Sequence, residues 1–375
     1  MIYIIGIAIT LFLSVILLTK RGKSGADRIL FGWLCVVSLQ LTLFSIIFSK
    51  EYVRFPFLLG FEIPLPLLHG PFLLLYTKAL TDGYSSFRKM SLHFIPFIIV
   101  FISILPFLLL DRVEKIHVYQ HEGEGYRLLS SAILIIIVLS GMIYTVLSLC
   151  VLIRHRSLIK DNFSYTEKIN LEWLYRLVIG LSCIWVLVVF ANGEIVFASV
   201  VLFVVFIGYY GIKQVGIFTN QPSLELLLTA SKAGEEAEVF AAPVVNTKYE
   251  KTALASDQAQ AIHERLVLLM REKRLYQIPE LTLAMVSKEL DVHPNTLSQV
   301  INTVEKKNFF DYINTLRIEN FKERVTILDN QKYTLLSLAY DCGFNSKTSF
   351  NRNFKNYTGK SPSQYVKEAK VRLKE

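Results

Sequence analysis

The chain has 375 residues, of which 53% are hydrophobic, and its mean hydropathy is +0.43. A soluble domain needs a wetted surface, so these values exclude a chain that is soluble throughout and place part of it in a lipid bilayer. Lys and Arg outnumber Asp and Glu by 40 to 31, and the resulting net charge of +9 suits an anionic partner, either nucleic acid or lipid head groups.

The first 212 residues carry the apolar stretches. One bilayer crossing takes about 20 residues in a helix, and seven candidate spans meet this requirement. They are Ile2–Thr19, Ile29–Ser49, Phe55–Leu80, Leu92–Leu110, Leu128–Ile153, Leu177–Ala191 and Ile195–Ile212. Asn192–Glu194 separates the last two spans, and we expect a tight hairpin there because one continuous helix would be too long for a single crossing. The sequence therefore predicts a seven-helix transmembrane bundle over residues 1–212.

Basic residues in the connections give this bundle a direction. Alternate connections hold 13 Lys and Arg in one set, which includes residues 20–28 and 154–176, and 5 in the other set. Cytoplasmic loops carry the excess of positive charge. We therefore expect the N-terminus outside and everything after Ile212 in the cytoplasm.

The third span is unusual because it holds four prolines and two ionisable residues, Glu62 and His69. Broken helices and charged groups at membrane depth are costly, and they are tolerated beside protein or a water-filled cavity. A ligand or proton site is one interpretation, which makes Glu62 and His69 a candidate signal site. The other is a kinked packing helix, in which Glu62 reaches the outer interface and His69 bonds a neighbouring helix.

The four cysteines offer no metal or disulfide pattern, because no two of them form a CxxC pair. Cys35, Cys150 and Cys183 lie in apolar runs and Cys342 lies in a polar region. We expect them to be small core residues without chemistry, and we expect no metal and no cofactor.

After the last span the composition changes. Residues 213–255 mix small, charged and Pro/Gly residues and are predicted to be a linker with one short helix at Ser223–Ser231. Residues 256–280 begin with an amphipathic helix that Ser256 can cap. This helix could pack on the domain that follows, couple that domain to the membrane part, or form a dimer contact.

Residues 281–375 contain two similar helix-turn-helix patterns. The first, Leu281–Asn302, has a turn at Asp291–His293 and a second helix that Pro294 opens. The second, Tyr333–Phe354, has Gly343 in its turn and Ser346 as the expected cap. One long helix, Asn308–Leu328, joins them, and a capping box at Ser361 starts a final helix.

In such a motif the second helix enters the major groove, so its open face should carry the DNA contacts. Asn and Gln side chains can pair with adenine and Arg with guanine, whereas Lys and hydroxyl groups can hold phosphates. For any one residue a solvated polar face is an equally good interpretation. The candidate DNA-binding residues are Asn295, Thr296, Ser298, Gln299, Asn302, Lys347, Thr348, Asn351, Arg352 and Lys355.

The basic residues of this domain lie at its end. Residues 260–329 hold ten Lys and Arg against ten Asp and Glu, whereas residues 330–375 hold nine against three. The second unit should therefore grip the phosphate backbone harder, and its binding should depend strongly on salt.

The pattern of Gly343, Phe344, Phe350, Phe354, Lys355, Gly359, Pro362 and Tyr365 resembles the C-terminal signature of AraC-type transcriptional regulators. Residues 281–370 are similar to the whole DNA-binding domain of that family, and the full chain resembles its membrane-embedded bacterial members. The resemblance implies two recognition helices that read successive major grooves, with base contacts at Asn295, Ser298 and Gln299 and at Lys347, Thr348, Asn351 and Arg352. His293 departs from the pattern because the family commonly has a capping Ser there. The first recognition helix should therefore be less firmly capped than the second.

Together these features predict an all-α, multi-pass protein of the bacterial inner membrane whose cytoplasmic domain binds specific DNA and regulates transcription. The membrane part is expected to serve as anchor and sensor. Expected partners are double-stranded DNA, the lipid bilayer and RNA polymerase, with a homodimer and a small-molecule or membrane signal as further candidates. Two alternatives are a transporter or membrane signalling protein with a regulatory appendage, and a protein-docking module. The chain lacks HExxH, GxSxG and Gly-rich phosphate-binding motifs, so an enzyme is not expected.

Overall fold

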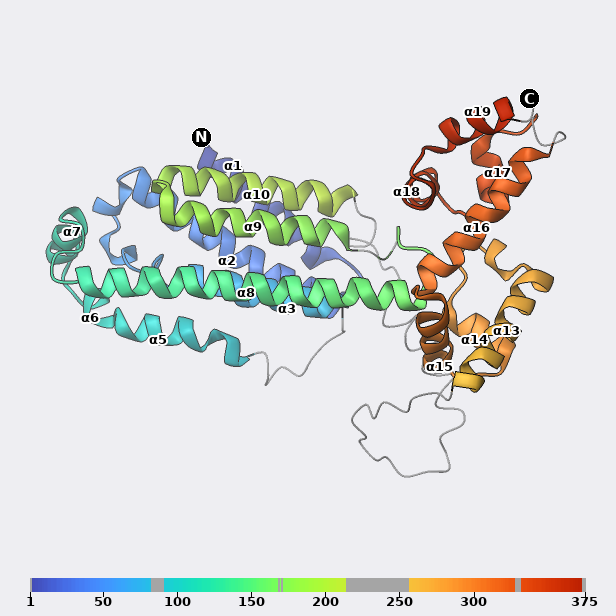
Figure 1. The fold of residues 1–375 in the computed structure, drawn as a ribbon. Coiled ribbons are helices and arrows are strands. Elements are labelled where there is room, and N and C mark those ends of the chain that lie inside the picture. The colour runs from blue at the N-terminus through green and yellow to red at the C-terminus, as the bar shows by residue number, and fades with distance from the viewer. Residues whose placement is uncertain are drawn as a thin grey trace. The chain divides into compact units, whose positions relative to one another are not determined.

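A computed structural model describes residues 2–81, 91–167, 169, 171–213, 256–327 and 332–372. These residues form helices, turns and one isolated β-bridge, which confirms the predicted all-α class (Figure 1). The chain divides into two compact units. Unit 1 contains Met1–Ile153 and Leu171–Ala230, and unit 2 contains Arg154–Asn170 and Ser231–Glu375.

Unit 1 is a bundle of apolar helices with short 3₁₀ turns between some of them. Its elements are α1 (Ile2–Thr19), α2 (Gly25–Phe48), η1 (Glu51–Val53), η2 (Pro56–Leu58), α3 (Pro66–Thr81), η3 (Leu92–Phe94), α5 (Ile95–Ser103), α6 (Leu105–Leu108), α7 (Arg112–Gln120), most of α8 (Arg127–Asn162), α9 (Glu172–Phe190) and α10 (Gly193–Lys213). The predicted hairpin is present, because α9 ends at Phe190 and α10 begins at Gly193.

Four helices within the described residues are long and apolar enough to cross a membrane: Gly25–Phe48, Arg127–Asn162, Glu172–Phe190 and Gly193–Tyr210. Ile4–Thr19 and Leu92–Ser103 are shorter apolar helices. The prediction of seven spans is thus supported in part, and the number seven stays a prediction.

Prolines explain why two predicted spans are not single helices. In the third, Gly60 to Leu65 is a series of turns and the helix begins only at Pro66, a position that needs no backbone N–H donor. In the fourth, α5 ends at Ser103 and α6 begins at Leu105, because Pro106 cannot donate to the preceding turn. The apolar pattern therefore located these regions, and the prolines set where their helices start.

Close approach between helices in unit 1 depends on glycines. A Cβ atom on Gly70 would lie 2.7 Å from the ring of Tyr144, and one on Gly141 would lie 2.3 Å from the ring of Trp185. Small residues at helix contacts are typical of packing in a lipid environment.

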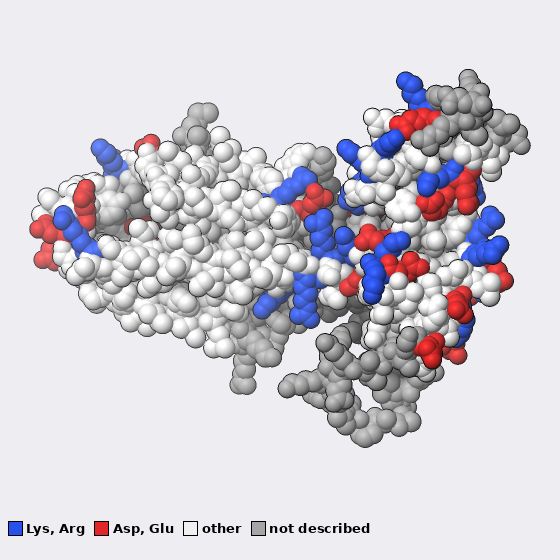
Figure 2. Space-filling model, in the orientation of Figure 1, with Lys and Arg blue, Asp and Glu red and all other residues white. Residues whose placement is uncertain are grey.

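The visible flank of unit 1 is almost free of charge between its two ends (Figure 2). Large apolar side chains of unit 1 such as Ile98, Leu139 and Leu202 are exposed, while Trp33 and Leu174 are buried inside the bundle. Cys35, Cys150 and Cys183 are also exposed, so our expectation of core cysteines is wrong for these three. An apolar run marks a helix that prefers lipid, and such a helix leaves part of its apolar surface uncovered by protein.

Unit 2 holds the C-terminal turns of α8, the segment that follows it, and the helices of the C-terminal part. These are α13 (Ser256–Lys273), η4 (Leu275–Gln277), α14 (Leu283–Leu290), α15 (Pro294–Val300), the π-helical turn η5 (Ile301–Glu305), α16 (Phe309–Thr326), α17 (Leu335–Asp341), α18 (Lys347–Thr358) and α19 (Pro362–Arg372). The predicted linker at 213–255, with its short helix, lies outside the described residues apart from Lys213.

Two separate hydrophobic cores lie along α16. The first gathers Leu266 and Met270 of α13 with side chains of α14, α15 and the start of α16. The second gathers Phe321 of α16 with Phe350 and Phe354 of α18 and residues of α17 and α19. α16 therefore joins two small subdomains, as the sequence predicts.

Candidate nucleic-acid interface

The first helix-turn-helix motif consists of α14, the turn Asp291–His293 and α15. Thr282 caps α14 by accepting a hydrogen bond from the Met285 backbone N at 3.2 Å. Asp291 ends α14 in the left-handed conformation, with φ of 52°, which turns the chain toward α15. Both helix boundaries agree with those predicted.

His293 caps α15 in place of the Ser that the family resemblance leads one to expect. Its Nδ1 atom accepts a hydrogen bond from the Asn295 backbone N at 3.2 Å. α15 has seven residues and passes directly into η5, where the helix is wider than a regular α-helix. The predicted departure at His293 is therefore present, but the imidazole does supply a cap.

The second motif consists of α17, the turn Cys342–Ser346 and α18. Ser346 accepts a hydrogen bond from the Ser349 backbone N at 3.0 Å and so starts α18 as predicted. Gly343 has φ of 97°, and a Cβ atom there would lie 2.5 Å from the Tyr276 carbonyl oxygen. The turn therefore requires glycine for two independent reasons.

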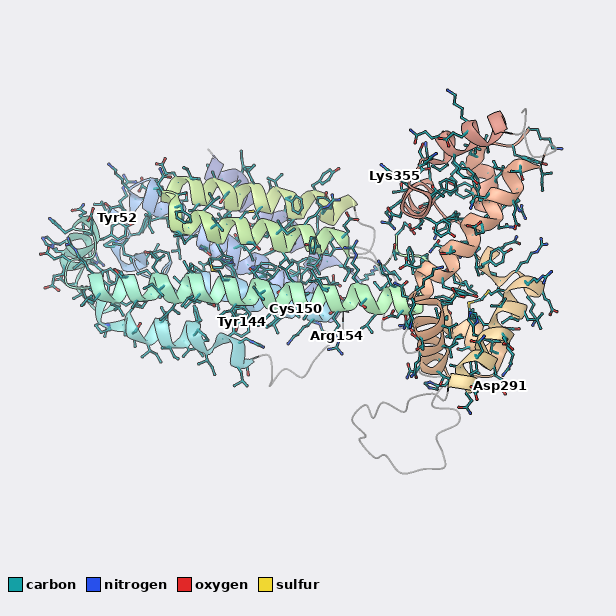
Figure 3. All side chains as sticks on the ribbon, viewed as in Figure 1. Tyr52, Tyr144, Cys150, Arg154, Asp291 and Lys355 are labelled. Carbon is teal, nitrogen blue, oxygen red and sulfur yellow. The ribbon has the colours of Figure 1, made fainter. Side chains whose placement is uncertain are left out.

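The predicted DNA-binding side chains of the second helices are largely accessible. Eight of them are exposed: Asn295, Gln299, Asn302, Lys347, Thr348, Asn351, Arg352 and Lys355. Thr296 and Ser298 are half-buried. Figure 3 shows Lys355 on α18 and Asp291 at the end of α14. The remaining face of α18 is anchored, because Phe350 and Phe354 are buried in the second core.

Arg317, in the middle of α16, links the two subdomains, and no local sequence pattern singles it out. Its guanidinium is buried and donates to the carbonyl oxygens of Tyr276 at 2.7 Å and Ile278 at 2.7 Å, just before the first motif. It also lies over the ring of Phe344, in the turn of the second motif. Burial lowers the pKa of Arg317 to about 10, so the group stays charged at neutral pH.

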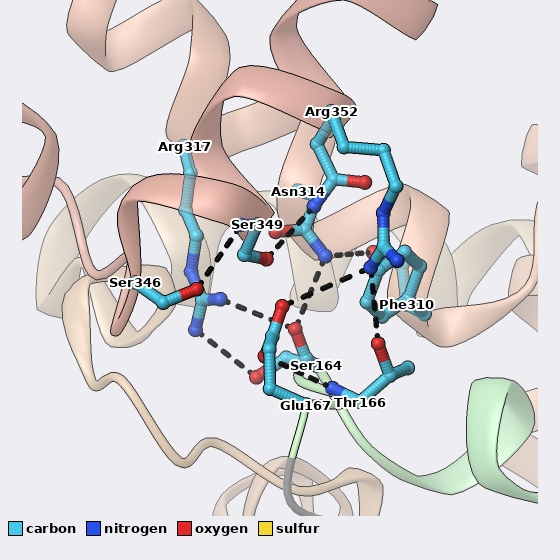
Figure 4. A network of polar contacts seen from close by, with 10 residues as sticks. Ser164, Thr166, Glu167, Phe310, Asn314, Arg317, Ser346, Ser349 and Arg352 are labelled. Carbon is cyan, nitrogen blue, oxygen red and sulfur yellow. Dashed lines mark hydrogen bonds and ion pairs between the residues drawn. The ribbon is translucent and has the colours of Figure 1, made fainter. Parts of the chain in front are cut away.

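The segment that follows α8 completes this network (Figure 4). Arg317 donates to the Ser164 carbonyl oxygen at 3.2 Å and to its hydroxyl at 3.0 Å, and Asn314 donates to the same carbonyl at 3.1 Å. The backbone of Phe163 forms a β-bridge with Thr282. Because Ser164 is about 150 residues from Asn314 and Arg317 in the sequence, no local pattern could have predicted these contacts.

The same segment reaches one of the candidate base-reading residues. Arg352 Nη2 donates to the Thr166 hydroxyl at 3.2 Å and lies 3.7 Å from Glu167 Oε1. No hydrogen-bond partner of Glu167 Oε1 is found among the described residues. Thr166 and Glu167 are thus the additional residues that the structure brings to the candidate interface.

The structure places Glu62 and His69 in two neighbouring cavities of unit 1. Glu62 is buried, accepts a hydrogen bond from the Gly60 backbone N at 2.8 Å, and lines a cavity of about 530 Å³. His69 lines a second cavity of about 280 Å³, where Trp33 donates to its Nδ1 at 3.0 Å and Gln40 contacts its Nε2. Both cavities have mostly apolar walls and share Phe44, Pro66, Leu134 and Ile137.

One group in unit 1 has the residue types of a cation site. It consists of His117 in α7, His121 just after α7, and Glu124. Each side chain offers one ligand atom, and these atoms lie within 4.8 Å of one another. His121 Nδ1 is paired with the His117 carbonyl oxygen at 2.8 Å, which leaves its Nε2 available. All three side chains are exposed.

Comparison with known proteins concerns the C-terminal part. Residues 286–368 match the family described as a helix-turn-helix domain. The Msm operon regulatory protein of Streptococcus mutans is 29% identical over 83 residues, which cover 22% of this chain and 29% of that protein. The uncharacterized HTH-type transcriptional regulator YijO of Escherichia coli is 30% identical over 95 residues, or 25% of this chain and 32% of that protein. The chain thus spans about a third of the length of these curated relatives, and no solved structure matches it.

Proposed function

We propose that this chain, whose C-terminal part is an AraC-type helix-turn-helix domain, is a membrane-bound regulator that binds specific DNA sequences. The observation that carries the proposal is the pair of helix-turn-helix motifs held on one helix, each with a polar and accessible second helix. An α-helix of this kind fits the major groove, and two of them can read one face of the duplex over successive grooves.

The two second helices are proposed to divide the contacts by chemistry. Asn295, Gln299 and Asn302 are amides, which suit adenine, and Arg352 suits guanine. Lys347 and Lys355 suit phosphates, with hydroxyl groups beside them. The basic excess of residues 330–375 supports the assignment of most phosphate contacts to the second motif and the helix after it.

Unit 1 is proposed to hold the protein in the inner membrane, with its N-terminus outside and unit 2 in the cytoplasm. Four helices of sufficient length and an uncharged flank support this placement, as do the basic residues concentrated in alternate connections. α8 alone, with 36 residues, is about 54 Å long, whereas the hydrocarbon core is about 30 Å thick. Its C-terminal turns can therefore extend into the cytoplasm.

We further propose that unit 1 senses a signal through the two cavities that Glu62 and His69 line. The buried carboxyl group and the Trp33–His69–Gln40 contacts supply polar groups within mostly apolar walls, which is the usual composition of a small-molecule site. Glu62→Leu and His69→Leu should each abolish the response of the target promoter to its inducing condition. An unchanged response in both variants would leave these residues with a packing role.

The DNA-binding proposal is tested with the full-length protein in lipid nanodiscs and a DNA duplex selected from a random library. Arg352→Ala should cost about 1–3 kcal/mol of binding free energy and relax the preference at one base pair. Lys355→Ala should weaken binding to every sequence and lower the salt slope by about 1. Lys273, which pairs with Glu289 on α13 and α14, provides a control, and Lys273→Ala should leave the preference unchanged.

If the wild-type protein binds all duplexes equally, specific DNA recognition is wrong. Tight binding that ignores salt would favour a protein-docking role for the two motifs instead, because phosphate contacts always release counterions.

A further inference from the structure

The segment Phe163–Glu167, called the tether here, is built into the DNA-binding unit. Its first four residues, Phe163 to Thr166, are all buried, and Ser164 is only 1% exposed. The Ser164 backbone N donates to the Leu281 carbonyl oxygen at 3.1 Å, beside the β-bridge to Thr282. The tether is therefore fixed to the residues that precede and cap the first helix-turn-helix motif.

Buried polar side chains of α16 hold the tether from the other side. Asn314 and Arg317 donate three hydrogen bonds to Ser164, at 3.0 to 3.2 Å. Asn314 also donates to the Phe310 carbonyl oxygen, and Arg317 to those of Tyr276 and Ile278. Buried donors are costly to leave unpaired, and the tether supplies further acceptors for these two side chains. Its position is thus determined by both flanking elements.

At its C-terminal end the tether engages α18. The Thr166 hydroxyl and the Glu167 carboxylate face the Arg352 guanidinium, whose side chain is 41% exposed, while that of Glu167 is 24% exposed. A DNA phosphate would offer the same guanidinium an oxygen acceptor with a negative charge, and a guanine edge would offer it the neutral acceptors O6 and N7. Arg352 therefore has two competing classes of partner.

Space beside Arg352 allows the side chain to move. A cavity of about 160 Å³ lies between the end of α8, the start of α16 and α18, and Arg156, Lys160, Asn353 and Asn356 line it together with Arg352. Asp311 also lines the cavity, but the two positive charges of Arg156 and Lys160 outnumber its one negative charge, so they disfavour Arg352 there when Glu167 no longer pairs with it. Loss of the Glu167 contact should then direct Arg352 outward.

We propose that the tether is an internal competitor of DNA: Thr166 and Glu167 occupy Arg352 and weaken DNA binding at α18 until the tether shifts. This inference rests on the proposed DNA-binding function and adds its regulation. Because α8 ends at Asn162, the tether continues directly from a helix that also belongs to unit 1. A displacement of the end of α8 would therefore reach Arg352 through the next few residues.

The test uses the full-length protein in nanodiscs and a duplex that the wild-type protein selects from a random library of about 30 base pairs, enough for two recognition helices one helical turn apart. Glu167→Gln should bind this duplex about 3-fold more tightly than wild type, the size expected for one partly exposed ion pair. Adding Thr166→Val should raise the gain to about 10-fold.

Glu289→Gln is the matched control, because Glu289 is an ion-paired and accessible carboxylate of the same unit, far along the sequence from α18. It removes the same charge and should change affinity less than Glu167→Gln. In an Arg352→Ala background the gain in affinity from Glu167→Gln should disappear, because the guanidinium for which Glu167 and DNA compete is then absent.

The proposal is overturned if Glu167→Gln binds more weakly, which would make the tether a positioning element for Arg352. It is equally overturned if the gain persists without Arg352 or equals that of Glu289→Gln. Failure of the proposed function gives a different result, namely a wild-type protein that selects no sequence from the library.

Discussion

The two helix-turn-helix motifs share one connecting helix but differ in how their second helices are built. α15 has seven residues, is capped by an imidazole and passes into a π-helical turn. α18 has twelve residues, is capped by Ser346 and ends at Gly359 in the left-handed conformation. Of the two second helices, α18 is therefore the one with the preferred residue types at both its N-terminal and its C-terminal cap.

Charge separates the motifs as well. The part of the domain with the first motif is neutral in sum and offers mainly amides, whereas the part with the second motif carries the basic excess and Arg352. Electrostatic contacts supply affinity without sequence information, and amide contacts supply sequence information at small electrostatic gain. This difference suggests that the second motif grips the DNA and the first motif refines the choice of sequence.

The largest expected effect concerns the turn of the second motif. Gly343→Ala should destabilise unit 2 by about 3 kcal/mol, because the new Cβ would strain a positive φ and collide with the Tyr276 carbonyl oxygen. Urea-dependent proteolysis of the full-length protein, followed through its C-terminus, measures the loss.

Gly359→Ala is its control. Gly359 also has positive φ, 74°, but a Cβ atom added there would meet no atom of the described residues within 4 Å, so the cost should be about 1 kcal/mol. Equal losses at the two glycines would show that backbone strain alone, and not the contact with the first subdomain, sets the requirement at Gly343.

The second prediction separates salt-dependent affinity for DNA from preference for a base sequence. Arg352→Ala and Gln299→Ala should each cost about 1–3 kcal/mol at one base pair. Lys355→Ala, which removes a proposed phosphate contact of the second motif, should make binding less dependent on salt, whereas Gln299→Ala should not, because Gln299 carries no charge. Binding measured at several salt concentrations compares the slopes, and identical slopes for Lys355→Ala and Gln299→Ala would contradict the division of roles between the motifs.

The smallest effects concern the two caps. Ser346→Ala should cost about 1 kcal/mol, and His293→Ser should stabilise the first motif by about 0.5 kcal/mol by supplying a preferred capping hydroxyl. The same proteolysis measurement applies to both. If His293→Ser destabilises the unit, the imidazole has a second role beyond its bond to the Asn295 backbone N.

Local signals explain what could be predicted from the sequence. Thr282, Ser346 and the Ser361–Gln364 capping box start their helices where expected, because each acts on backbone groups within three residues. The apolar runs likewise located the helices of unit 1. The prolines at 64, 66 and 106 changed helix starts that apolar length alone had placed elsewhere.

Long-range contacts explain what could not be predicted. Arg317 is one of several basic residues of the helix predicted at Asn308–Leu328, and its role depends on carbonyl groups that lie about 40 and about 150 residues away. Glu167 was part of a connection between two spans and was assigned no function. Neither Arg317 nor Glu167 has a sequence neighbour that would reveal its partner, so only the folded chain identifies them.

The placement of the tether has a consequence for the order in which the protein is made. A ribosome adds about 5–20 residues per second, and Arg317 lies 153 residues after Ser164, so roughly 8–30 s pass between the synthesis of the two. During that time Arg317 does not yet exist to bind Ser164, while α9 and α10 are made. The contacts between Ser164 and Arg317 can therefore form only after α9 and α10 of unit 1 have been made.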